Sequence, residues 1–165
     1  MTALGQWLVL LHILSAFALV AGLVGREFAR AYALRQDELK TFIQLIGLSG
    51  WFENKLVIPG SNAVLVFGLL AAWVRGWPLL GLLQGSPINW LFVSLLLYLI
   101  LIPMIIFVFL PRGKIFGQKL AVAQAQGLIT REVRAAMEDP VVRVAHIVEA
   151  LVILFIIYLM VMKPF

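Results

Sequence analysis

The sequence predicts an all-α integral membrane protein, a bundle of four transmembrane helices with a short cytoplasmic helix between the third and fourth spans. Of its 165 residues, 63% are hydrophobic and 13% are charged, whereas soluble domains average about 45–50% apolar and about 25% charged residues. Apolar stretches of about 20 residues, the length that crosses a hydrocarbon core, recur along the chain. The basic residues gather between these stretches, as they do in membrane proteins.

Four segments have the length and composition of a span: residues 7–25, 51–74, 88–110 and 141–162. The third contains no charged residue and is the clearest. The second is harder to place, because the stretch from Thr41 to Trp73 is too long for one span and contains Glu53 and Lys55. We therefore assign residues 37–50 to an amphipathic helix at the membrane interface. Together the spans predict one transmembrane domain over residues 1–165.

Prolines should modify these helices at defined places. Pro59 and Pro103 lie inside spans and should kink them, which a membrane bundle tolerates when neighbours satisfy the freed carbonyl groups. Residues 127–140 (GLITREVRAAMEDP) predict the short helix, with Thr130 as its N-cap and Pro140 ending it.

The distribution of positive charge predicts the orientation. Cytoplasmic connections carry an excess of Lys and Arg, so both termini should face outside and the Gly- and Pro-rich residues 75–87 should form an exterior turn. The start of the chain lacks the features of a cleaved signal peptide, so the first span should be retained. The basic residues on the predicted cytoplasmic side are Arg26, Arg30, Arg35, Lys40, Arg112, Lys114, Lys119, Arg131, Arg134 and Arg143, against Arg75 and Lys163 on the other.

Composition also narrows the chemistry. The chain has no cysteine, which excludes disulfides, thiolate metal sites and thiol redox chemistry. Its net charge is +5, and the basic residues lie in the connections between the spans, where membrane proteins place them to set their orientation. We therefore expect the lipid bilayer as its partner and no nucleic acid.

His12 is the one ionisable residue well inside the outer half of a span. Intramembrane ionisable residues face the bundle interior and are candidates for function. Its ring has three open interpretations: a hydrogen bond to a carbonyl or hydroxyl across the bundle, coordination of a haem iron or copper, and proton transfer. The residues that share its helical face are mostly small, which favours close helix packing: Ser15, Leu19, Gly22 and Arg26.

A second polar group lies near the cytoplasmic ends of three spans, and Arg26 and Glu27 at the end of the first span belong to it. Glu53, Lys55 and Glu149 are the candidates for a catalytic role, and His146 shares a helical face with Glu149. They form either a salt-bridged rim that anchors helix ends or a polar pocket open to the cytoplasm. His146 should lie about 15–20 Å from His12 along the membrane normal, too far for the two to bind one haem.

Parts of the chain are familiar as sequence. Four stretches resemble a family of predicted bacterial integral membrane proteins with four helices, over nearly the whole length. This resemblance implies a location in the bacterial inner membrane, and it implies no activity. The stretches are WLVLLHILSAFALVAGL (7–23), GSPINWLFVSLLLYL (85–99), GLITREVRAAMEDPVVRVAHIVEA (127–150) and IIYLMVMKPF (156–165).

A more distant resemblance connects the chain to the J-type protoporphyrinogen oxidases of haem synthesis. It implies that His12 is associated with haem b as an iron ligand. The third span departs from the pattern, since it lacks the basic residue that those oxidases carry. The matching positions are Leu11, His12, Ile13, Ala21, Gly22, Leu23 and Arg26 in the first span, Glu53, Lys55, Leu56 and Pro59 in the second, and Glu149, Lys163, Pro164 and Phe165 at the end.

Two hypotheses on function follow. The first is a haem-binding redox protein in which His12 binds the cofactor, while Glu53, Lys55 and Glu149 handle protons or substrate carboxylates. The second is a non-enzymatic module: a membrane subunit, an assembly factor or a component of a small transporter. In both, further copies of the chain or other chains of a membrane complex are candidate partners.

Overall fold

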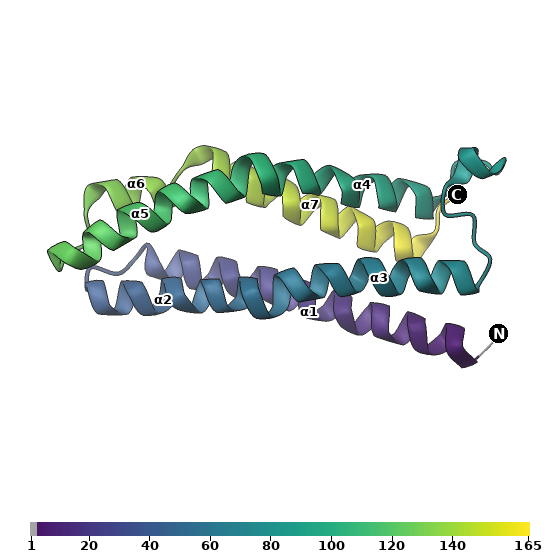
Figure 1. Cartoon of the computed structure of the whole chain (residues 1–165), viewed down its shortest axis with the longest axis horizontal. Helices are drawn as coiled ribbons and strands as arrows, with labels where there is room; N and C mark the ends of the chain where they lie inside the picture. Colours follow the sequence, from purple (N-terminus) through teal and green to yellow (C-terminus); the bar gives the residue numbers. More distant parts are fainter. Residues whose placement is uncertain (1–2) are drawn as a thin grey trace. The chain divides into compact units, whose positions relative to one another are not determined.

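Long apolar helices make up most of the described chain, as the hydrophobic stretches predict (Figure 1). The structure, a computed structural model, describes residues 3–165. Four helical stretches are long and apolar enough to cross a membrane, which confirms the predicted all-α, four-span architecture. They are Ala3–Ala33, Leu39–Val74, Trp90–Gln126 and Arg131–Met162.

These stretches group into two compact units, Met1–Leu79 and Leu80–Phe165. The first contains α1 (Ala3–Ala33), α2 (Leu39–Phe52), the π-helical turn η1 (Glu53–Val57) and α3 (Ile58–Val74). The second contains the 3₁₀ turn η2 (Gly81–Gln84), α4 (Trp90–Met104), the π-helical turn η3 (Ile105–Phe109), α5 (Leu110–Gln126), α6 (Arg131–Met137) and α7 (Pro140–Met162). The single domain expected over residues 1–165 stays a prediction.

Several helices extend beyond the predicted spans. α1 continues to Ala33, and α5 prolongs the third span to Gln126, where Gly127 ends it in a left-handed conformation (φ 71°). The helix expected over residues 37–50 is α2, which passes through η1 into α3 without a break, so it is not a separate helix. Its location at the membrane interface stays a prediction. Charged residues limit the part of a helix that can lie in an apolar environment. They do not end the helix itself, because Glu, Lys and Arg are good helix formers.

The short helix between the third and fourth spans forms as predicted. α6 begins after Thr130, whose Oγ1 accepts a hydrogen bond from the Val133 N–H at 3.2 Å. α6 ends at Met137, three residues before Pro140, as the predicted stop requires, and the same proline begins α7. A proline suits the first turn of a helix, where its missing N–H has no partner to lose. Asp139 caps the same helix end through the Val141 N–H at 2.8 Å.

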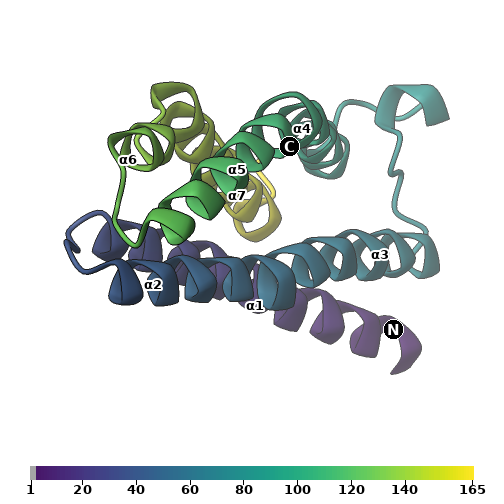
Figure 2. The same ribbon diagram turned by 60° about the vertical axis from the view of Figure 1, so that its left-hand side comes forward.

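In the first unit, α1 lies antiparallel along the continuous helix of α2, η1 and α3 (Figures 1 and 2). Small residues allow this contact. A Cβ on Gly60 would lie 2.9 Å from the backbone nitrogen of Leu19, and one on Gly22 would lie 2.8 Å from Leu56 Cβ. Leu19, Gly22 and Arg26 are buried, so this face of α1 packs against a helix as predicted.

In the second unit, α7 packs along α4 and contacts η3, and α6 packs against α5. The α4–α7 contact buries Ser94, Leu101 and Leu159. Val133 of α6 and Ala123 of α5 are fully buried, so the part of this unit that follows η3 has an apolar core of its own. Arg112 of α5 pairs with Asp139, which ties the start of α7 to α5.

The helical stretches Leu39–Val74 and Trp90–Gln126 each contain a five-residue π-helical turn, and a proline follows two residues after the turn. Ile58 N–H donates to the Glu53 carbonyl before Pro59, and Leu110 N–H donates to the Ile105 carbonyl before Pro111. Proline has no N–H, and its ring clashes with the carbonyl four residues earlier. A turn with bonds to the fifth residue back is one way for a helix to accommodate this defect. Pro103, which we expected to kink its helix, lies inside α4 just before η3.

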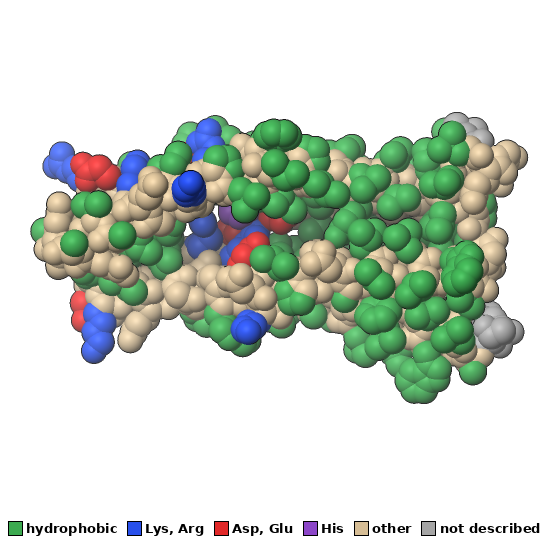
Figure 3. All heavy atoms as spheres, in the orientation of Figure 1, with side chains coloured by type: hydrophobic (Ala, Val, Ile, Leu, Met, Phe, Trp, Pro, Cys, Tyr) green, Lys and Arg blue, Asp and Glu red, His purple; other side chains and the backbone are tan. Residues whose placement is uncertain are grey.

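The surface separates charged from apolar side chains within each unit. On the face in Figure 3, charged side chains lie over α2 in one unit and over α5 and α6 in the other, whereas α3 and α4 are covered by hydrophobic side chains. Phe17 and Trp73 are 70% and 75% exposed. Apolar side chains of this size remain exposed where lipid is the solvent.

The predicted orientation can be tested by labelling, because the chain has no native cysteine. Gln126 at the end of α5 and Gln84 in η2 are both exposed. A cysteine at Gln126 should react only with reagent applied from the cytoplasm, and a cysteine at Gln84 only with reagent applied from outside. The reverse pattern would show that the charge rule gives the wrong orientation for this chain.

Candidate functional site

His12 lies nine residues into α1, about 14 Å along the helix from Ala3. Its ring is half-buried, and its Nδ1 lies 2.9 Å from the carbonyl oxygen of Val64 on α3. A carbonyl oxygen only accepts hydrogen bonds, so Nδ1 is the protonated nitrogen. In the neutral ring the lone pair is then on Nε2. The histidine is thus oriented by a backbone acceptor on a neighbouring helix, which was one of the three open interpretations.

Gly68 makes room for this ring. A Cβ at this position would lie 2.9 Å from His12 Nδ1 and 3.0 Å from its Cε1. A side chain at this position would require the imidazole to shift from its place beside α3. Ser15, one turn further along α1, donates instead to the Leu11 carbonyl of its own helix at 2.7 Å. His12 therefore makes the polar contact that links α1 to α3 at this depth.

The second polar group of the first unit is centred on Arg26. Its side chain is 7% exposed, and its Nη1 lies 2.7 Å from Glu53 Oε2 in the π-turn η1. Its Nε lies 3.2 Å from Oε1 of Glu27, the next residue of α1. Burying a guanidinium is costly unless anions pair with it, and these two carboxylates provide the charge. Arg26 lies fourteen residues from His12, about 21 Å along α1.

The structure gives Glu53 a different partner from the one the sequence suggested. We grouped Glu53 with Lys55 and Glu149. Lys55 is exposed, and the residue that pairs with Glu53 is Arg26. Glu149 lies in the second unit and pairs with His146 of its own helix. The three candidate residues therefore have three different surroundings, and a catalytic role for any of them stays a prediction.

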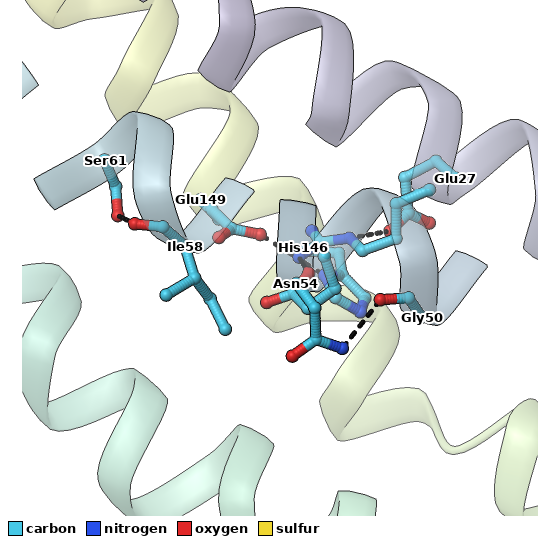
Figure 4. Close-up of polar contacts among 9 residues, drawn as sticks. Glu27, Gly50, Asn54, Ile58, Ser61, His146 and Glu149 are labelled. Carbon is cyan, nitrogen blue, oxygen red and sulfur yellow. Dashed lines mark hydrogen bonds and ion pairs between the residues drawn. The ribbon is translucent and has the colours of Figure 1, made fainter. Parts of the chain in front are cut away.

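Two side chains, one in the π-turn that carries Glu53 and one just after it, donate hydrogen bonds to backbone carbonyls. Asn54 Nδ2 donates to the Gly50 carbonyl at 2.7 Å, and just beyond the turn Ser61 Oγ donates to the Ile58 carbonyl at 3.1 Å (Figure 4). A π-turn widens the helix and disturbs its regular ladder. These side-chain bonds to carbonyls add polar contacts on either side of the widened turn. π-turns of this kind are frequent at functional sites.

His146 and Glu149 form the polar group of the second unit. Both project from α7 towards one another (Figure 4), with His146 Nδ1 3.3 Å from Glu149 Oε2. Their side chains are 12% and 10% exposed. The imidazole stacks on Phe109 of η3, with ring centroids 4.6 Å apart. The predicted shared face of His146 and Glu149 is confirmed, and in each unit one buried polar group lies against a π-turn.

Sequence reasoning placed Arg26 in the polar group near the cytoplasmic ends of the spans and on the face of α1 that holds Leu19 and Gly22, without naming Glu53 as its partner. It missed one contributor, Phe109. Phe109 carried no signal, since one phenylalanine in an apolar span resembles any other lipid-facing residue. The proline two positions later was the only local hint that the helix is irregular there.

The sequence of the chain matches a known family over almost its entire length. The sequence profile of the family described as a predicted integral membrane protein (DUF2269) matches residues 6–164. The chain belongs to the DUF2269 family. This confirms the first resemblance noted in the sequence. No curated protein and no solved structure matches the chain.

Proposed function

We propose that this DUF2269 protein binds haem b, with His12 as the residue that would hold its iron. The observation that supports the proposal is the bond between His12 Nδ1 and the Val64 carbonyl. Histidines that ligate metals commonly donate their other ring nitrogen to a carbonyl or carboxylate, which fixes the tautomer and aims the lone pair at the metal. In His12 that lone pair is on Nε2.

The composition of the chain favours a porphyrin over a bare metal ion. The protein has two histidines and no cysteine, whereas a protein-bound zinc ion takes three or four side-chain ligands. A porphyrin supplies four nitrogens itself, so iron within it needs one or two ligands from the protein. When bound, haem would supply one-electron chemistry. The lipid-exposed apolar surface around the first half of α1 suits the apolar faces of such a cofactor.

The protein's own residues would set the environment of the cofactor. The Val64 carbonyl orients the imidazole, and Gly68 leaves the space that the ring occupies. The Arg26–Glu53 pair lies too far along α1 to touch a group held at His12, so we assign it a separate role in packing or in binding charged groups. Oxidation of a porphyrinogen is a narrower proposal, and it rests only on the resemblance of the first, second and last spans to J-type protoporphyrinogen oxidases.

The proposal predicts a histidine-dependent haem spectrum. Wild-type protein and a His12→Gln variant would be expressed in haem-replete membranes, and the Soret absorbance per mole of folded protein compared. Glutamine can still donate to the Val64 carbonyl but is not an iron ligand of the same kind. We expect the variant to lose most of the absorbance. Gly68→Ala should lower it as well, because the new methyl group displaces the ring.

The matched control is His146→Gln, which removes the other histidine of the chain. It should keep the Soret band. Equal haem content in wild type and His12→Gln would rule out His12 as ligand. Folded wild-type protein without haem would contradict the proposed function and favour the second candidate.

That second candidate is a non-enzymatic membrane module, such as a subunit or an assembly factor. The observation in its favour is that the buried Arg26 of α1 pairs with Glu53 of η1, while His146 and Glu149 bond to each other within α7. An ion pair between two helices, such as Arg26–Glu53, holds them in register. A colourless protein that co-purifies in fixed ratio with another membrane chain would support this function.

A further inference from the structure

Arg75 follows directly after the second candidate span, which ends at Val74. Its Cζ lies 5.0 Å from the centroid of the Trp77 ring. This cation–π contact holds the guanidinium at the end of α3. This contact does not satisfy the N–H donors of the guanidinium. The face of an aromatic ring offers π-electron density, whereas an N–H group needs an acceptor atom with a lone pair.

The side chain of Arg75 does not cap the end of α3, although Arg75 is the residue that follows the helix. Cationic side chains near a helix C-terminus often donate to the last carbonyls, but here backbone N–H groups already bond to them. Gly76 makes this closure possible by its left-handed conformation, with φ 66°. The three closing bonds run from Arg75 N–H to Ala71 O at 3.1 Å, from Gly76 N–H to Trp73 O at 3.0 Å and from Trp77 N–H to Ala72 O at 3.0 Å.

Among the described residues, the Nε of Arg75 is buried and makes no hydrogen bond. A guanidinium carries five donors and stays charged in proteins, and an unpaired buried donor costs free energy. The side chain is therefore arranged for an acceptor that comes from outside the chain. A planar guanidinium matches a phosphate or carboxylate group best, because it can donate two parallel hydrogen bonds.

The position of Arg75 along the helix indicates which anion is available. Trp73, two residues earlier on α3, is 75% exposed, and Trp7 near the start of α1 is 63% exposed. Tryptophans with this exposure at the ends of spans lie at the level of lipid headgroups. At that level the abundant anion is the phosphodiester of a phospholipid. We propose that Arg75, held against Trp77, binds the phosphate group of a membrane lipid at the end of α3.

The second unit has a comparable pair. Lys163, just after α7, has its Nζ 5.3 Å from the Trp90 ring at the start of α4. By the predicted topology Arg75 and Lys163 are the only basic residues on their side of the membrane. Both basic residues on this side therefore lie beside the indole ring of a tryptophan. The lipid site depends neither on haem nor on which side of the membrane this end faces.

The experiment measures lipid binding by native mass spectrometry of the full chain released from detergent. Phosphatidylglycerol would be titrated against wild type, Arg75→Gln, Arg75→Lys and the control Arg131→Gln, which neutralises an exposed arginine of α6. We expect Arg75→Gln to weaken the tightest lipid binding about tenfold, the effect of a lost charge-assisted hydrogen bond. Arg75→Lys should weaken it about threefold, because lysine keeps the charge without the fork. Arg131→Gln should bind as wild type does.

Inorganic phosphate distinguishes a lipid from a free anion. Phosphate added without lipid should bind far more weakly than phosphatidylglycerol, because it lacks the acyl chains that contact the apolar surface of α3. Equal binding of inorganic phosphate and lipid would overturn a lipid headgroup as the ligand. Equal lipid affinity of wild type and Arg75→Gln would overturn the site itself, and correct folding of the variant would be checked by its circular dichroism.

Discussion

Alanine in place of Gly60 should lower the free energy of unfolding by about 2 kcal/mol, the usual cost of adding a methyl group to a closely packed interface. The new Cβ would lie 2.9 Å from the Leu19 nitrogen and 3.1 Å from its Cα. These atoms belong to the backbone of α1, so relief requires a shift of the whole helix. Unfolding in mixed micelles by added dodecyl sulfate, followed by tryptophan fluorescence, measures the change.

Gly47 is the matched control. It lies in α2 of the same unit, and a Cβ there would meet no atom within 4 Å. Alanine at Gly47 should leave stability unchanged or raise it by up to about 1 kcal/mol, because alanine has the higher helix propensity. A similar loss of stability at both glycines would mean that helix propensity or lipid contacts, and not the approach of α1 to α3, determine the effect.

This contact was partly predictable from the sequence. The spacing of His12, Ser15, Leu19, Gly22 and Arg26 identified the face of α1 that packs against another helix, and three of these five residues are buried. The partner helix could not be chosen in the same way. Gly60 has no periodic signal of its own in α3, which is apolar all round.

The four spans were predictable because membrane crossing imposes a length and an apolar composition. Their outer limits were not. α1 and α5 continue past the apolar segments into charged sequence, where helix propensity and packing against α2 and α6 decide the end point. The signals that did fix ends were specific ones, such as the Thr130 cap and Gly127.

The partner of Glu53 escaped prediction for a physical reason. Glu53 and Lys55 are two residues apart, and side chains at this spacing do not face each other on a helix. Lys55 is accordingly exposed, while Glu53 pairs with Arg26 of α1. Both residues lie in the π-turn η1, whose wider winding makes the 3.6-residue spacing a poor guide to which helix each side chain meets. Pro59 indicated an irregularity without indicating which residues the wider turn would include.

The Arg26–Glu53 pair predicts strong coupling in a double-mutant cycle. Glu53→Gln should lower the free energy of unfolding by about 2 kcal/mol, because it removes one of the two carboxylates that balance a buried guanidinium. The cost stays below that of a fully buried pair, since the Glu53 side chain is 36% exposed and Glu27 remains. Arg26→Met alone should cost a similar amount through the lost ion pairs.

In the double variant the pair is broken only once, so the combined loss should fall short of the sum by about 1 kcal/mol. Lys55→Met combined with Glu53→Gln is the control cycle. Lys55 is exposed and lies on another side of η1, so these two losses should add within about 0.5 kcal/mol. Additive losses for Arg26 and Glu53 would show that the two charges are stabilised independently. Coupling between Lys55 and Glu53 would instead show that Glu53 pairs with Lys55, as the sequence first suggested.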